Sequence, residues 1–177
     1  KISKGRGYST VSIYKKPIKI RGFSNVTSDG YGIITLDYDN CDISVIEEDW
    51  KLIQDIYKLP TGYLFESSKN KFHVICLKKF LQTKVYEILQ CTRIDNNYKT
   101  MITRNPFKSY VIRISPKGKR KRPRFLRTIG KNINLNSSVS EAHLKLLKKL
   151  YKLPEINYHN LDGGKNIKVH EYETINY

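Results

Sequence analysis

Two aspartates spaced one residue apart are the side chains in this sequence that most directly suggest chemistry. Asp37 and Asp39 end the apolar stretch 31–39 and alternate with Tyr38. In a β-strand, side chains two residues apart leave the same face, so both carboxylates can reach one ion. Carboxylate oxygens suit Mg²⁺ or Mn²⁺, which makes this pair a candidate metal site. The alternative is an ordinary turn at the end of a strand.

A second polar group follows about thirty residues later. The segment 67–73 reads Ser-Ser-Lys-Asn-Lys-Phe-His. Its hydroxyls and cations are of the kind that hold a triphosphate, and Lys71 and His73 share a strand face because they are two apart. We take Ser68, Lys71 and His73 as candidate nucleotide-binding residues. A histidine between two apolar residues is, taken singly, more often structural.

Asp95 is the third acid of interest, because residues 67–135 hold eighteen basic side chains and only two acidic ones. A lone carboxylate in such a segment either pairs with an arginine or binds metal. The sequence does not choose between these roles.

These residues need elements that position them, and the pattern of apolar residues predicts which ones. A helix is expected from Ser44, with Glu47 at the capping-box spacing, to the stop at Pro60. The polar turn 67–70 suggests a hairpin. The expected strands are 31–39, 62–66, 71–77, 110–115 and 124–129, and the other expected helices are 78–91 and 136–154. This alternation predicts the α+β class, with helices packed on a mixed or antiparallel sheet.

The length favours one catalytic domain over residues 1–154, with the motifs in a core of about 30–130. Its last helix is expected at 138–153, and residues 155–177 read as a loosely packed extension. Three cysteines without zinc-site spacing are expected to be core thiols in a reducing compartment, with no zinc. Without a membrane-length apolar stretch or a signal peptide, we expect a cytoplasmic protein with no membrane partner.

Charge is distributed unevenly along the chain. The 33 lysines and arginines exceed the 16 acids by 17, yet eight of the acids fall within residues 31–66. A basic chain around an acidic block suggests a polyanionic partner and an acidic centre. For the acids of the first helix, Glu47, Glu48, Asp49 and Asp55, a solvated surface is the better interpretation.

In order and spacing, the three motifs resemble the archaeo-eukaryotic primase superfamily. Leu36 to Asp39 is similar to its hDhD motif, where h is hydrophobic. Lys71 to His73 is similar to its sxH motif, although Lys71 replaces the small residue, and Ile94-Asp95 is similar to its hD motif. Residues 30–115, roughly, resemble the small primase-polymerase domains of archaeal, viral or plasmid elements. No cysteine or histidine cluster in the sequence matches the zinc-binding stem of many relatives.

The resemblance implies an RRM-like primase core and metal-dependent nucleotidyl transfer in the replication of a mobile element. Asp37, Asp39 and Asp95 would hold Mg²⁺ or Mn²⁺. Ser68, Lys71, His73 and Arg113 would hold the incoming NTP or dNTP. The implied partners are a single-stranded DNA template and primer, with a helicase or larger primase subunit as a further candidate, in the cytoplasm of the host cell.

Basic residues near the third motif and in the run 117–124, which has six cations in eight residues, fit a nucleic-acid path. A solvated loop is the alternative. The candidate nucleic-acid contacts are Arg104, Lys108, Lys117, Lys119, Arg120, Lys121, Arg122, Arg124 and Arg127.

Two other functions remain open from the sequence. One is a metal-dependent nuclease in which Asp39, Glu66 and Lys69 imitate an acid plus E-x-x-K arrangement, although the usual order has one residue between the last two. The other is a replication protein that binds nucleic acid without catalysis. A rolling-circle relaxase is disfavoured, since the four histidines form no His-hydrophobe-His pair.

Overall fold

The computed structural model describes residues 18–104, 109–132, 136–162 and 167–174. The strands are β1 (Ile18–Thr27), β2 (Tyr31–Asp39), β3 (Gly62–Ser68), β4 (Lys71–Leu81), β5 (Val111–Arg113), β6 (Arg124–Ile129), β7 (Val139–Ser140), β8 (Leu161–Asp162) and β9 (Ile167–Thr174). The helices are α1 (Ile43–Tyr57), α2 (Gln82–Gln90), α3 (Asn96–Arg104) and α4 (Glu141–Leu150).

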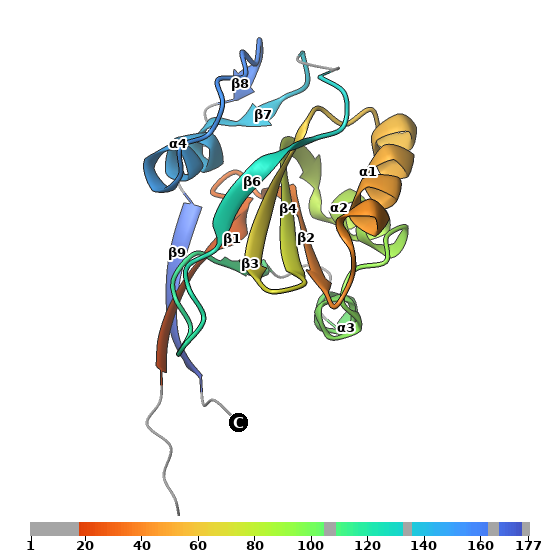
Figure 1. The fold of residues 1–177 in the computed structure, drawn as a ribbon. Coiled ribbons are helices and arrows are strands. Elements are labelled where there is room, and N and C mark those ends of the chain that lie inside the picture. Colours follow the sequence, from red (N-terminus) through yellow and green to blue (C-terminus); the bar gives the residue numbers. More distant parts are fainter. Residues whose placement is uncertain (1–17, 105–108, 133–135, 163–166, 175–177) are drawn as a thin grey trace, which may run out of the picture.

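The strands form one open sheet that is mostly antiparallel. Its central order is β5-β1-β2-β4-β3-β6, and each neighbouring pair is antiparallel. β9 pairs with β1, β7 pairs with β4, and β8 runs parallel to β7. In Figure 1, β1 and β9 leave the body of the sheet together as a two-stranded arm. The predicted α+β class with a largely antiparallel sheet is confirmed.

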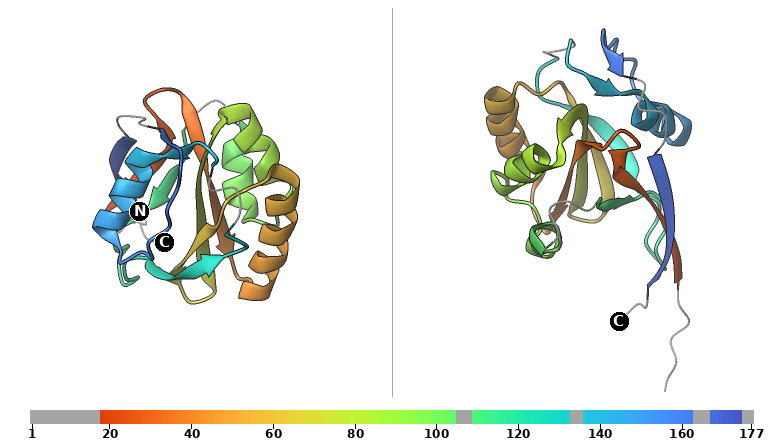
Figure 2. Two further views of the ribbon diagram at one scale, coloured as in Figure 1. Left: turned by 90° about the horizontal axis from the view of Figure 1, so that it is seen from above. Right: turned by 180° about the vertical axis from the view of Figure 1, so that it is seen from behind.

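Helices cover both faces of the sheet. α1, α2 and α3 lie on one side, and α4 lies on the other (Figures 1 and 2). Ile46, Trp50 and Ile53 of α1 are buried at helical spacing, which gives this helix its apolar face. Asp49 is buried as well and pairs with Arg93 at 2.7 Å, so the expected solvated surface is wrong for this acid. The predicted Ser44 capping box is not formed, because the helix begins one residue earlier, after Asp42, whose side chain makes no cap hydrogen bond.

The predicted hairpin of β3 and β4 is present, and its turn contains Asn70 in the left-handed region at φ 56°. β4 is longer than expected. Phe80 and Leu81 continue the strand because they pair with Gly32 and Tyr31 of β2. The helix expected over 78–91 is therefore shortened to α2. The residues before α2 also fit a helical pattern, but they form a strand because they pair with β2.

The C-terminal region differs from its prediction. Residues 167–174 form β9, which pairs with β1 from Ile18↔Thr174 to Thr27↔Ile167, so this part of the expected loose extension belongs to the sheet. The helix expected over 136–154 is confined to α4 and is preceded by β7. Ser140 caps α4 by accepting a hydrogen bond from the backbone N–H of His143.

The three cysteines carry free thiols, but they do not share one environment. Cys76 is buried, Cys41 is half-buried and Cys91 is exposed, so the expectation of three core thiols is wrong for Cys91. Within the described segments, no helix is both long and apolar enough to cross a membrane.

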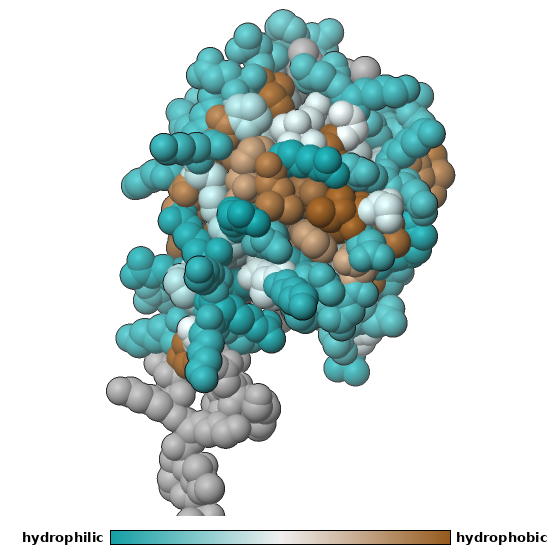
Figure 3. All heavy atoms as spheres, viewed as in Figure 1, coloured by the Kyte–Doolittle hydropathy of each residue, from teal (hydrophilic) through white to brown (hydrophobic). Residues whose placement is uncertain are grey.

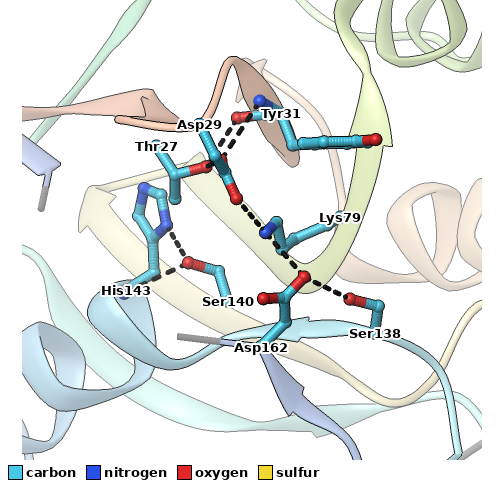
Figure 4. Close-up of polar contacts among 8 residues, drawn as sticks. All are labelled: Thr27, Asp29, Tyr31, Lys79, Ser138, Ser140, His143 and Asp162. Carbon is cyan, nitrogen blue, oxygen red and sulfur yellow. Dashed lines mark hydrogen bonds and ion pairs between the residues drawn. The ribbon is translucent and has the colours of Figure 1, made fainter. Parts of the chain in front are cut away.

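A buried lysine ties the C-terminal region to the sheet. The ammonium of Lys79 on β4 forms ion pairs with Asp29 of the β1–β2 turn and, at 2.9 Å, with Asp162 of β8. Figure 4 shows the Lys79 ammonium lying between these two carboxylates. Its side chain is only 2% exposed, so both partners are needed to offset the loss of hydration. We call these three residues the Lys79 cluster.

Candidate active site

Asp37 and Asp39 lie at the end of β2, as the sequence predicts, and face residues of β4. The register pairs Asp37 with His73 and Asp39 with Lys71. Because paired residues of neighbouring strands lie on the same face, these four side chains form one polar group. The aspartate motif of β2 and the Lys71–His73 motif of β4 therefore lie side by side on directly paired strands.

The contacts within this polar group are unequal. The Lys71 ammonium forms an ion pair with the Asp39 carboxylate. His73 Nε2 lies 3.4 Å from Asp37 Oδ1, and burial, with the nearby charge of Arg113, lowers the pKa of His73 to about 3. His73 is thus uncharged near neutral pH and does not balance the charge of Asp37.

The environment of Asp37 raises its pKa to about 7, first through burial, then through the negative charges of Asp39 and Asp95. Such a shift marks a carboxylate whose charge is poorly compensated. A cation beside Asp37 would remove this imbalance. Perturbed carboxylates of this kind are concentrated at functional sites.

Asp95 lies close to this polar group through its backbone. Its N–H donates a hydrogen bond to the Asp37 carbonyl oxygen at 2.8 Å. Its carboxylate Oδ1 accepts a hydrogen bond from the backbone N–H of Tyr98 at 2.9 Å and so caps the start of α3. The third acidic motif is therefore adjacent to the first, but its side chain already performs a structural task.

A cleft of about 250 Å³ opens over these strands, and most of its polar lining was anticipated. The predicted residues that line it are Asp37, Asp39, Lys71, His73, Arg113, Lys117 and Arg120. Carboxylates therefore lie on one side, and basic side chains of β5 and the following loop lie on another. Asp95 and Ser68 are not among the lining residues.

Arg113 fixes one wall of the cleft. Its guanidinium donates to the carbonyl oxygens of Ser67 at 2.9 Å and Lys121 at 3.2 Å, and to that of Ser115. These bonds tie β5, the loop after it and the end of β3 together. Arg113 is therefore part of the frame of the cleft as well as a source of positive charge.

Some lining residues had no obvious signal in the sequence. Ser67 reaches the cleft at a β-bulge between Glu66 and Ser68, an irregularity that the polar turn did not reveal. Tyr98 and Met101 come from α3, which was not predicted. Tyr98 places its hydroxyl 2.9 Å from that of Thr35, on the same face of β2 as Asp37.

The remaining predicted contacts are dispersed. Ser68, Lys121, Arg122 and Arg124 line a neighbouring hollow, where Arg124 pairs with Glu66 at 2.8 Å. Arg104 and Lys119 are exposed, and Arg127 pairs with Glu47 on α1. Lys108 lies outside the described residues. Because Glu66 faces this hollow and not the carboxylate cleft, the acids of the nuclease alternative are not gathered at one site.

The donor chemistry fits a hard divalent cation at Asp37 and Asp39, which share one face and line one cleft, because the charge of Asp37 is poorly compensated. No group of three or more His, Cys, Asp or Glu side chains is arranged to hold a metal within the described ranges. The fit therefore extends to the aspartate pair, and Asp95 contributes its charge but not a demonstrated third ligand.

Comparisons with protein-family models, with curated proteins and with solved structures returned no significant match.

Proposed function

We propose that this chain is a metal-dependent nucleotidyltransferase of the primase-polymerase type. The observation that carries the proposal is the meeting of Asp37 and Asp39 with Lys71, His73 and Arg113 in a single cleft of about 250 Å³. A polyanionic substrate fits the excess of 17 positive charges.

Asp37 and Asp39 would hold Mg²⁺ or Mn²⁺, which when bound would neutralise phosphate charge and activate a primer 3′-hydroxyl. Lys71 balances Asp39 in the structure and can turn toward phosphate when another cation takes its place. His73, being uncharged, offers hydrogen bonding without adding positive charge. Arg113 and the basic loop after β5 would bind the triphosphate or the template.

The arrangement of elements supports an RRM-like core as the finer description of the fold. Apart from α3, which is inserted between α2 and β5, the chain order from β2 to β5 follows the strand-helix-strand-strand-helix-strand pattern, and β4 lies between β2 and β3 in the sheet. One departure is that β1 lies between β2 and β5. The proposed partners are a single-stranded DNA template with its primer and an NTP or dNTP, in an intracellular setting.

Primer extension on a single-stranded template, with Mg²⁺ or Mn²⁺ and either dNTPs or NTPs, tests the proposal. The variant Asp37→Asn plus Asp39→Asn should lose incorporation by about 100-fold or more, because it removes the negative charge of both candidate ligands without changing side-chain size. Asp55→Asn on the exposed side of α1 is the matched control and should retain activity. Unchanged incorporation by the double variant would contradict the proposal.

Cleavage and binding assays separate the two alternative functions. Metal-dependent cleavage that is lost in Glu66→Gln, without any incorporation, would favour a nuclease. Tight, salt-sensitive DNA binding without nucleotide binding by calorimetry would favour a non-catalytic binding protein.

A further inference from the structure

Two further hollows adjoin the carboxylate cleft. The first, of about 490 Å³, shares Ser67 with the cleft. The second, of about 370 Å³, shares Arg122 and Arg124 with the first. Because each hollow shares lining residues with the next, the three are neighbours, and we call them together the track.

The first hollow is suited to phosphate. Lys69, Lys121 and Arg122 line it together with the hydroxyl of Ser68, and all three basic residues are exposed. Glu66 is the one acid among its described lining residues, and it is already paired with Arg124 at 2.8 Å. The hollow therefore keeps an excess of positive charge and hydrogen-bond donors.

The second hollow has an aromatic floor. Tyr151 and Phe125 both pack on Phe65, with ring centroids 4.8 and 5.6 Å away, so the buried Phe65 ring supports both of them. Both rings are half-buried and line the hollow. The Arg122 guanidinium lies 4.9 Å from the Tyr151 ring centroid and donates to the Leu150 carbonyl oxygen. Partly exposed aromatic rings beside a cation are typical surfaces for the stacking of unpaired bases.

The strand register links the aromatic floor to the cleft. Phe125 pairs with Phe65, Phe65 with His73, and His73 with Asp37, so one row crosses β6, β3, β4 and β2 on a single face. Three strand spacings separate its ends, about 14 Å. Figure 3 shows apolar side chains gathered over β6 within a largely hydrophilic surface.

We infer that a single-stranded nucleic acid follows this track, with phosphates in the first hollow and an unpaired base on Tyr151 and Phe125 in the second. The inference deepens the proposed function, since the strand would be the template entering the cleft. A duplex does not satisfy this arrangement, because paired bases cannot offer a face to the aromatic floor.

Fluorescence anisotropy with a labelled oligothymidylate, without divalent cations or nucleotides, tests base stacking independently of catalysis. Tyr151→Leu should weaken binding by at least about fivefold, whereas Tyr151→Phe, which keeps the ring, should bind like the wild type. An abasic strand of equal length should bind wild type and Tyr151→Leu equally. Equal binding of oligothymidylate by both proteins would overturn the inference, as would equal weakening by the leucine and phenylalanine variants.

The phosphate contacts have their own signature. Lys69→Gln plus Lys121→Gln should reduce the slope of log affinity against log salt by about 1.4, while Lys51→Gln on α1 should leave it unchanged. An unchanged slope in the double variant, or duplex binding as tight as single-strand binding, would also overturn the inference. Circular dichroism melts confirm that each variant is folded.

The two proposals can fail separately. If Asp37→Asn plus Asp39→Asn loses incorporation but binds oligothymidylate like the wild type, both proposals are supported. If the wild type shows the Tyr151 effect and incorporates no nucleotide, the binding track is supported and the proposed catalytic function fails.

Discussion

The carboxylate cleft and the Lys79 cluster both contain aspartates beside a lysine, but the charge of Asp37 in the cleft is poorly compensated whereas the carboxylates of the Lys79 cluster are paired. In the Lys79 cluster, one buried ammonium meets two carboxylates, and the hydrogen bond from Lys79 lowers the pKa of Asp162. In the cleft, burial and neighbouring acids raise the pKa of Asp37 to about 7.

The difference lies in what faces each carboxylate. Burial alone would raise the pKa of Asp29, but hydrogen bonds from Lys79 and Thr27 lower it. Asp37 instead faces His73, which is uncharged near neutral pH. A charge balanced by a fixed partner stabilises the fold, whereas an unbalanced charge at a cleft is available to a ligand. We therefore interpret the Lys79 cluster as structural and keep the cleft as the proposed active site.

Activity should separate the two regions most strongly. Asp37→Asn plus Asp39→Asn should reduce nucleotide incorporation by about 100-fold or more, because the cation loses the negative charge of both candidate ligands. Asp29→Asn should leave the specific activity of the folded protein unchanged. Extension rates normalised to folded protein provide the measurement, and similar losses in both variants would abolish the distinction.

Stability should separate them in the other direction. Lys79→Met should lower the free energy of unfolding by about 2 kcal/mol, since it leaves two carboxylates facing each other without their cation. The partial exposure of Asp29 and Asp162 keeps this cost below that of a fully buried pair. Urea unfolding measures it. A variant as stable as the wild type would show that the cluster does not hold the C-terminal region in place.

A buried histidine near the Lys79 cluster predicts how stability depends on pH. His143 lies between Ser140 Oγ and the Ser24 carbonyl, and burial lowers its pKa to about 4. The unfolded chain therefore takes up this proton first, so stability falls as pH drops from 6.5 toward 4. Between pH 7 and pH 5 the loss should be about 2 kcal/mol.

His143→Gln tests this dependence, because glutamine keeps a donor for the Ser24 carbonyl but does not titrate. Urea unfolding at several pH values should show a shallower decline in the variant than in the wild type. His73, whose pKa is also lowered, will maintain part of the decline in both proteins. Identical pH profiles would exclude a contribution from His143.

The smallest expected effect is the change in stability when one aspartate in each region is replaced by asparagine. Asp37→Asn should raise the free energy of unfolding by about 1 kcal/mol, because it removes a poorly balanced charge, while Asp29→Asn should lower it. Thermal melts at pH 7 measure both. A loss of stability in Asp37→Asn would mean that the charge of this carboxylate stabilises the folded protein.

Local patterns in the sequence predicted much of the site but not its frame. The strand 31–39 and the strand 124–129 have the predicted bounds, because their apolar residues and end signals are contiguous. The hairpin that carries Lys71 and His73 was also predicted from a local signal, the polar turn 67–70. Asp37 and Asp39 therefore face these two residues as the motifs suggested.

Long-range pairing accounts for what the sequence did not reveal. β1 pairs with β9 through partners such as Ile18 and Thr174, which no local pattern connects. Asp95 has the residue type expected of a ligand, but its side chain caps α3, a helix that was not predicted. The Lys79 cluster likewise joins residues from three distant segments.

One measurement tests the central claim directly. Crystals soaked with Mn²⁺ and a non-hydrolysable nucleotide should give an anomalous difference peak within coordination distance of Asp37 and Asp39, with none beside Asp29 and Asp162. A peak at the Lys79 cluster, or no peak between the two cleft carboxylates, would contradict the account.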